Sequence, residues 1–343
     1  MNKKTKKCEY FFKNHLTNEK KGCIITALTK VGDSPEPLGS KLSLAADGRK
    51  KENKMKKIIT LTLAALMLLC SVLSLFSCGG QTADGADKVK TIDVKLTDEE
   101  YAFVSKKGNT ALVESFNAFL DEIKSNGTFD ALVAKYFEGE GTKVGYSITT
   151  TDIANTDSNL IVATNCPFEP FEYIGDDGKI YGLDIEIAAA YANANNLELV
   201  IKNINFDDIF PQVEAGYADI GMAGITVSAD RAEIYDFTNT YYAASQKLIV
   251  AADNTDFDNC KTVEDVEAVL SSLTGKKIGY QNGTTGGMYV VGDEDWGYTG
   301  FANITGKGYT TAQDAVMDLI NGNIYAVVVD EAPANALVKA ANE

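Results

Sequence analysis

From residue 160 onward, short apolar runs alternate with segments that have one apolar face. The runs are rich in valine, isoleucine and leucine, which favours buried strands, and the segments between them carry apolar residues at helical spacing. This alternation is typical of parallel α/β units. The predicted strands cover 160–164, 197–201, 277–280 and 325–329, with one near Ile304, and the predicted helices cover 184–194, 206–215, a segment from Gly286, and 312–320.

The part of the chain that precedes residue 160 has a different pattern. Apolar residues at helical spacing predict an amphipathic helix over 111–124. Asn126-Gly127-Thr128 ends this helix and caps a second one, which reaches residue 137. The stretch 138–159 is rich in Gly, Thr, Asp and Ser and is interpreted as a flexible linker. Residues 237–250 form a long extended run that suits a crossing between two lobes.

The chain length and the charge balance narrow the class of protein. A chain of 343 residues predicts two domains or lobes, since one core rarely grows past roughly 250 residues. Residues 1–78 carry 15 Lys and Arg against 6 Asp and Glu, which leaves 17 against 42 for residues 79–343. Residues 79–343, which we call the body, are therefore strongly acidic, and this charge disfavours nucleic acid and anionic lipid surfaces as partners.

The few histidines and cysteines exclude several kinds of site. The only histidine is His15, so the body cannot contain a Ser-His-Asp triad or a histidine metal site. Cys166 and Cys260 are the only cysteines after residue 78, and we interpret them as free thiols far apart. We therefore expect no metal, no cofactor and no catalytic residue.

A targeting segment precedes the body. Met55-Lys56-Lys57 and the apolar run 58–76 have the order of a signal peptide, and Cys78 follows. Residues 55–78 resemble a bacterial lipoprotein signal, in which Cys78 is acylated and 79–89 is a linker. The alternative is a transmembrane helix, because about 20 apolar residues can span a bilayer. Either interpretation places the body outside the cytoplasmic membrane, on its outer face.

Residues 1–54 do not fit this arrangement. They are basic and weakly patterned, and they stand in front of a complete signal. We hypothesise that translation starts at Met55 and that 1–54 is a mis-assigned upstream extension.

Arg231 is the only arginine after residue 78. It follows Thr226 and Ser228 in a segment of small and hydroxyl residues. A guanidinium binds a carboxylate through two parallel hydrogen bonds, which lysine cannot reproduce. The segment therefore suggests a carboxylate site, with a surface helix arginine as the alternative.

The ordered motifs of residues 160–335 are similar to those of extracellular solute-binding proteins of polar amino acid ABC importers, the family with glutamine-, histidine- and lysine/arginine-binding members. The matching motifs are Ala163-Thr164-Asn165, Pro170-Phe171-Glu172, Gly182-Leu183-Asp184-Ile185, Phe206 with Ile209-Phe210-Pro211, Gly216 with Asp219-Ile220, Ala223–Thr226 with Arg231, Asp236-Phe237-Thr238 with Tyr241-Tyr242, Gly279 with Gly283-Thr284-Thr285-Gly286, and Ala326–Asp330. The resemblance implies a two-lobed α/β fold of the periplasmic-binding-protein type (type II), with a hinge of crossing strands.

The order of the motifs departs from this family. After Asp330, a typical member continues with a strand, a return crossing and two helices. Here similar residues stand at the front, over 96–137. We therefore expect a circular permutant in which 90–103 belongs to lobe 2 and the hinge, 104–246 forms lobe 1, and 247–343 forms lobe 2. The alternative is a fused gene fragment.

The resemblance also implies a ligand site. Arg231 and Thr226 would hold the carboxylate of an amino acid, with Gly224 lining the contact and Thr285 and Gly286 adding donors from lobe 2. Asp330 would accept from the α-ammonium group, while Phe168 and Phe206 would shield the side chain. The partners implied are a small-molecule ligand, an ABC transporter permease and the membrane through the lipid anchor.

Simpler interpretations of these residues stay open. Thr226 and Thr285 could be helix caps, and Phe206 could be a core residue. Asn165 stands where members that bind basic ligands often have aspartate, so with Tyr280 and Asn282 it favours a polar neutral side chain such as that of glutamine. The competing functions are a dehydratase-like enzyme, for which Glu169 is the only obvious spare acid, and a ligand-sensing domain without transport.

Overall fold

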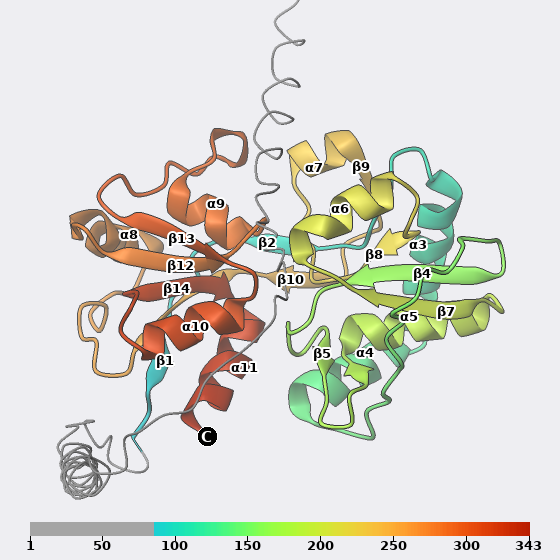
Figure 1. Ribbon diagram of the computed structural model, residues 1–343, viewed down its shortest axis with the longest axis horizontal. Coiled ribbons are helices and arrows are strands. Elements are labelled where there is room, and N and C mark those ends of the chain that lie inside the picture. The colour runs from blue at the N-terminus through green and yellow to red at the C-terminus, as the bar shows by residue number, and fades with distance from the viewer. Residues whose placement is uncertain (1–85) are drawn as a thin grey trace, which may run out of the picture. The chain divides into compact units, whose positions relative to one another are not determined.

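A computed structural model describes residues 86–343, which form two α/β lobes, each built on a five-stranded sheet (Figure 1). The predictions for 1–54, for the signal at 55–78 and for Cys78 lie outside the described residues. Within the described part of the chain, no helix has the length and apolar character needed to cross a membrane.

The lobe 1 sheet has the strand order β7-β4-β8-β3-β9. Its strands are β7 (Glu198–Asn203), β4 (Asn159–Thr164), β8 (Ile220–Gly221), β3 (Val104–Lys106) and β9 (Tyr235–Phe237). β4 is parallel to β7 and β8, whereas β3 is antiparallel to both of its neighbours. The helices are α3 (Thr110–Ser125), α4 (Thr128–Val133) with the π-helical η3 (Ala134–Glu138), α5 (Leu183–Ala194), α6 (Phe206–Glu214) and α7 (Ala229–Ile234). A hairpin of β5 (Tyr173–Ile174) and β6 (Ile180–Tyr181) completes the lobe.

The lobe 2 sheet has the strand order β1-β11-β14-β12-β13. Its strands are β1 (Val89–Thr91), β11 (Gln246–Ala251), β14 (Ala326–Asp330), β12 (Lys277–Gln281) and β13 (Thr305–Tyr309). Its helices are α8 (Val263–Ser272), α9 (Thr285–Val291), the 3₁₀ turn η4 (Glu294–Trp296), α10 (Ala312–Ile320) and α11 (Glu331–Asn342). The strands and helices predicted beyond residue 160 are confirmed to within a few residues. α8 and α11 are additions that the pattern did not predict.

Two short strands run between the lobes and pair with each other (Figure 1). β2 (Glu99–Tyr101) follows β1 and precedes β3, and β10 (Tyr242–Ala244) lies between β9 and β11. Tyr242 is opposite Tyr101 in this antiparallel pair. The extended run predicted for 237–250 is therefore β10 and most of β11, and it does cross from one lobe to the other.

The front segment is part of the lobe 1 core. Phe103, Phe116 and Leu120 are fully buried in one cluster with Leu160 and residues of α5. The Phe116 ring stacks on the Tyr191 ring of α5 with the centroids 3.6 Å apart. The predicted apolar face of the first helix is thus confirmed, because Phe116, Leu120 and Ile123 are its buried residues.

Residues 139–158 of the predicted linker lie between η3 and β4 and form no helix or named strand, but they are attached along lobe 1. The backbone of Tyr146 pairs with Ile180, and the Thr149 amide donates to the Ile201 carbonyl over 2.8 Å. The Asn155 amide group donates to Asp219 over 2.6 Å. These bonds oppose the free motion that the composition suggested.

Candidate functional site

A pocket between the two lobes contains almost all of the site residues predicted from the sequence. It is lined by Asn165, Phe168, Phe206, Gly224, Thr226 and Arg231 from lobe 1 and by Thr285 and Asp330 from lobe 2. Gly286 is the exception and lies behind Thr285. A Cβ at Gly286 would come within 2.9 Å of Gln246 Oε1, so close packing requires a glycine there. Glu172, Ala223, Gln281 and Thr284 also line the pocket but were not predicted.

Arg231 is held by contacts to both lobes. Its Nη1 donates to the Thr226 carbonyl over 2.8 Å, and its Nη2 donates to the Gly283 carbonyl of lobe 2 over 3.0 Å. The guanidinium also lies over the rings of Phe210 and Trp296, 4.8 Å and 5.0 Å from their centroids. Burial lowers the pKa of Arg231 to about 10, so it stays cationic at neutral pH. Such an arrangement orients a fixed positive charge at the pocket.

Asp330 stands at the end of β14, where it is also the N-cap of α11. It is 5% exposed, and the Tyr101 hydroxyl donates to its Oδ1 over 2.5 Å. Burial, and then the neighbouring Glu99, raise the pKa of Asp330 above its usual range. The carboxyl is thus poised for a cationic partner that would restore its ionised form.

Glu99 of β2 reaches the same region, although it was not among the predicted site residues. Its Oε2 accepts hydrogen bonds from the hydroxyls of Thr226 at 2.7 Å and Thr285 at 2.9 Å. Both threonines therefore act as donors to an anion. The helix caps are Ser228 for α7 and Thr284 for α9, so the simpler interpretation of Thr226 and Thr285 as caps is wrong.

Amide side chains from both lobes meet at another part of the pocket. Gln281 Nε2 donates to Asn165 Oδ1 over 2.7 Å, and Asn165 Nδ2 donates to the Ile204 carbonyl over 2.6 Å. Gln281 lines the pocket, whereas its neighbours Tyr280 and Asn282 do not. The expectation for Tyr280 and Asn282 is therefore wrong, because Tyr280 lies on the opposite face of β12 from Gln281 and Asn282 comes after the strand has ended.

Lobe 1 contributes two buried acids, Glu172 in the lining of the pocket and Asp184 beside it. Glu172 is fully buried, neither of its carboxyl oxygens has a hydrogen-bond partner among the described residues, and burial raises its pKa. Asp184 accepts from the Tyr241 hydroxyl and the Gly224 amide, and burial still raises its pKa to about 7. Glu169, expected to be the spare acid of the cleft, lies in a separate surface pocket with Tyr242.

Gly224 and Phe206 illustrate why particular residue types are needed here. Gly224 has a φ of +54°, and a Cβ there would lie 2.5 Å from the Phe168 ring. Both observations favour glycine at this position. Phe206 is buried in the lobe 1 core and also lines the pocket, so the two interpretations offered for it both apply.

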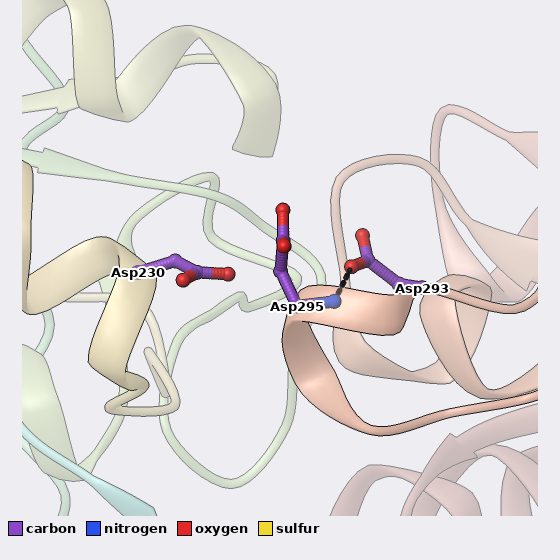
Figure 2. A group of neighbouring side chains, drawn as sticks. All are labelled: Asp230, Asp293 and Asp295. Carbon is purple, nitrogen blue, oxygen red and sulfur yellow. Dashed lines mark hydrogen bonds between the residues drawn. The ribbon is translucent and has the colours of Figure 1, made fainter.

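Three aspartates meet where α7 of lobe 1 approaches η4 of lobe 2. One carboxylate oxygen from each of Asp230, Asp293 and Asp295 lies within 4.8 Å of the others (Figure 2). Asp293 also accepts from the Asp295 amide over 3.0 Å. Partial desolvation and the neighbouring charges of Asp295, Glu233 and Asp293 raise the pKa of Asp230. The three carboxylates are thus a source of repulsion between the lobes.

Comparison with known sequences identifies the family. Residues 160–336 match the bacterial extracellular solute-binding proteins, family 3. The chain belongs to this family. This assignment confirms the resemblance in residues 160–335, and the two-lobed α/β fold agrees with it.

Several amino acid-binding proteins of Escherichia coli (strain K12) are similar to this chain. The histidine-binding periplasmic protein is 27% identical over 193 residues, covering 56% of this chain and 68% of the relative. The ABC transporter arginine-binding protein 1 is 28% identical over 186 residues, covering 54% and 69%. The L-cystine-binding protein TcyJ is 28% identical over 184 residues, covering 54% and 63%.

Two solved structures are also similar to part of this chain. Holo ArgBP from T. maritima is 30% identical, with a TM-score of 0.46 over 53% of this chain and 74% of that one. An ancestral arginine-binding protein bound to arginine is also 30% identical, with a TM-score of 0.46 over 54% and 76%.

Proposed function

We propose that this protein binds a polar amino acid between its lobes and delivers it to an ABC importer. The observation that carries the proposal is that Arg231 of lobe 1 and Asp330 of lobe 2 line one pocket. A zwitterion needs a fixed cation at one end and a fixed anion at the other, and these two groups supply them. The histidine-, arginine- and cystine-binding relatives support an amino acid as the ligand.

Each pocket residue has a role in this proposal. Arg231 binds the ligand carboxylate, with the hydroxyls of Thr226 and Thr285 as further donors. Asp330 accepts from the α-ammonium group, while Phe168 and Phe206 exclude water. The amide groups of Asn165 and Gln281 offer both donors and acceptors, which suits a polar neutral side chain such as that of glutamine.

Calorimetry on two variants tests the pocket assignment. Arg231→Ala and Asp330→Ala should each weaken binding by several kcal/mol, because each leaves one charge of the ligand buried without a partner. A thermal-shift screen of the twenty amino acids first identifies the ligand, since a tight ligand raises the melting temperature by mass action. We propose binding without turnover, so the ligand should be recovered unchanged. Near-native affinity in both variants would refute the assignment.

We also propose that the protein is a lipoprotein anchored through Cys78 to the outer face of the cell membrane, where it meets its permease. The signal at 55–78 supports this proposal. Cys78→Ala should move the native protein from the membrane fraction to the soluble one. The intact mass should show a chain that begins at Cys78 and carries lipid. A native protein that still contains residues from 1–54 would contradict both the anchor and the start at Met55.

The order of segments supports a further proposal, that the chain is a circular permutant of the family. Residues 89–137 lie before the matched range, yet β3 is inside the lobe 1 sheet and β1 pairs with β11 of lobe 2. The Lys88 amide donates to Asn342 Oδ1 over 2.8 Å, so the two ends of the described chain are neighbours. Joining them would restore the usual order of the family.

A rearranged gene tests the permutation. It would link residue 343 to residue 86 through a short Gly-Ser connection and open the chain within 139–158. We expect a folded protein that binds the same amino acid with similar affinity. A rearranged chain that is unfolded, while the natural order folds under the same conditions, would count against the proposal.

A further inference from the structure

Glu99 occupies a particular place between the lobes. It lies on β2, where the alternation of side chains buries Glu99 and Tyr101 and exposes Glu100. A single carboxylate oxygen of Glu99 accepts from Thr226 of lobe 1 and from Thr285 of lobe 2. The Thr97 hydroxyl holds its other oxygen over 2.7 Å. A group on a crossing strand thus joins both lobes through two hydrogen bonds to one anion.

These donors are also the ones that a ligand carboxylate would use. Hydroxyl hydrogen bonds to a carboxylate are stronger than those to a neutral acceptor. Two carboxylates cannot share the same pair of hydroxyls, since each hydroxyl has one hydrogen to donate and the anions repel each other. A ligand carboxylate that bonds to Thr226 and Thr285 therefore has to displace Glu99.

We propose that Glu99 is an internal competitor of the ligand. Its carboxylate holds the two lobes closed, and only a ligand that carries a carboxylate displaces it efficiently. The closing part depends only on the contacts of Glu99. The competing part rests on the proposed function, because it requires an amino acid in this pocket. Glu99 then sets both the affinity and the selectivity of the site. A neutral amide in place of the ligand carboxylate forms weaker bonds to the two hydroxyls and leaves Glu99 in position.

Small-angle X-ray scattering without added amino acid tests the closing part. Glu99→Ala should increase the radius of gyration, since the two bonds that join the lobes are lost. Glu100→Ala is the matched control, because Glu100 is the exposed neighbour on the same strand and its side chain accepts only from Thr240 among the described residues. Identical scattering of the wild-type and Glu99→Ala proteins would overturn the closing part.

Calorimetry tests the competing part, using the amino acid identified by thermal shift and its α-carboxamide. Glu99→Gln preserves the size of the side chain and removes its charge. It should tighten amino acid binding about ten-fold, because a larger fraction of molecules then has a free site. Discrimination against the α-carboxamide should fall, and Glu100→Gln should change neither value.

The possible outcomes distinguish a failure of the competing part from a failure of the proposed function. Weaker or unchanged amino acid binding in Glu99→Gln overturns the competitor, and weaker binding would mean that Glu99 contacts a cationic part of the ligand. If no amino acid binds to any variant while Glu99→Ala still opens the lobes, the proposed function and the competitor fail together and the closing role of Glu99 stands.

Discussion

The two lobes use the front segment of the chain in different ways. In lobe 1, β3 lies between β8 and β9 and is hydrogen-bonded on both sides. In lobe 2, β1 is an edge strand that pairs with β11 alone. Residues 104–106 therefore complete the lobe 1 sheet, whereas residues 89–91 only extend the lobe 2 sheet.

Despite this difference, both lobes place their pocket residues in the same way. Asp330 ends β14, Thr285 begins the helix after β12, and Asn165 directly follows β4. In open α/β sheets the ligand commonly lies outside the carboxyl ends of the strands. The strands that come from the front segment thus affect the stability of each lobe, but they have much less effect on where its binding groups lie.

Substitutions in the two front strands should have unequal effects on stability. Val104→Asp places a charge in a fully buried position between two strands. It should prevent lobe 1 from folding, because an unpaired buried charge costs several kcal/mol. Thr91→Asp, in the half-buried edge strand, should cost about 1 kcal/mol or less.

Urea unfolding followed by circular dichroism measures this difference. The prediction that β3 contributes more to stability than β1 is wrong if Thr91→Asp lowers the unfolding midpoint as much as Val104→Asp does. It is also wrong if Val104→Asp leaves the unfolding midpoint unchanged.

Stability should depend on pH through the acids buried in lobe 1. Folding raises the pKa of Asp184 to about 7, so its contribution to stability is fully present below its unfolded pKa and is lost as the pH rises through about 7. The raised pKa of Glu172 acts in the same direction. The melting temperature should therefore be higher at about pH 5.5 than at about pH 8.

Asp318 of lobe 2 provides the contrast. Its pKa is lowered by hydrogen bonds from Lys307 and Tyr309, so its contribution is lost only in strong acid. Asp184→Asn should reduce the change in melting temperature between the two pH values. Glu114→Gln, at an exposed position of α3, should leave it unaltered. A melting temperature that rises towards pH 8 would contradict the assignment to buried acids.

Trp296 should report ligand binding, because it is the only tryptophan and its ring lies 5.0 Å from the Arg231 guanidinium of the opposite lobe. Engagement of Arg231 by a ligand changes the charge beside the indole, so the emission should change and then saturate. Trp296→Phe should remove the signal and weaken binding about three-fold, as expected for the loss of a partly exposed cation–π contact. Emission that stays constant while calorimetry shows binding would count against this contact in solution.

Much of the fold could be predicted because local pattern and tertiary position agree. The apolar runs that form β4, β12 and β14 are buried strands, and the amphipathic pattern of α3 matches the face that packs on α5. α8 was missed since Glu264, Asp265 and Glu267 interrupt its apolar pattern, although Thr262 and Asp265 form a capping box that signals its start.

The site was only partly predictable from the sequence, for a physical reason. Arg231 and Asp330 stand out by residue type and by position in a motif. Glu99 and Gln281 do not, because their importance comes from neighbours that are far away in the sequence. Glu172 stands in a matching motif, but its place in the pocket was not predicted. The Thr285–Glu99 hydrogen bond joins residues 186 positions apart. The folding of the front segment between the lobes is what brings Glu99 to Thr226 and Thr285.

The smallest predicted effect concerns the aspartates at the boundary between the lobes (Figure 2). Asp295→Asn should favour the closed arrangement, since it removes one of three like charges that approach one another. The group is partly exposed, so we expect amino acid binding to tighten only about two-fold at low ionic strength. Salt at about 0.5 M should abolish the gain, because it screens exposed charges over a few ångströms. Titrations of Asp295→Asn and of Glu294→Gln, its exposed neighbour, at two salt concentrations distinguish this repulsion from a local packing change, which would not depend on salt.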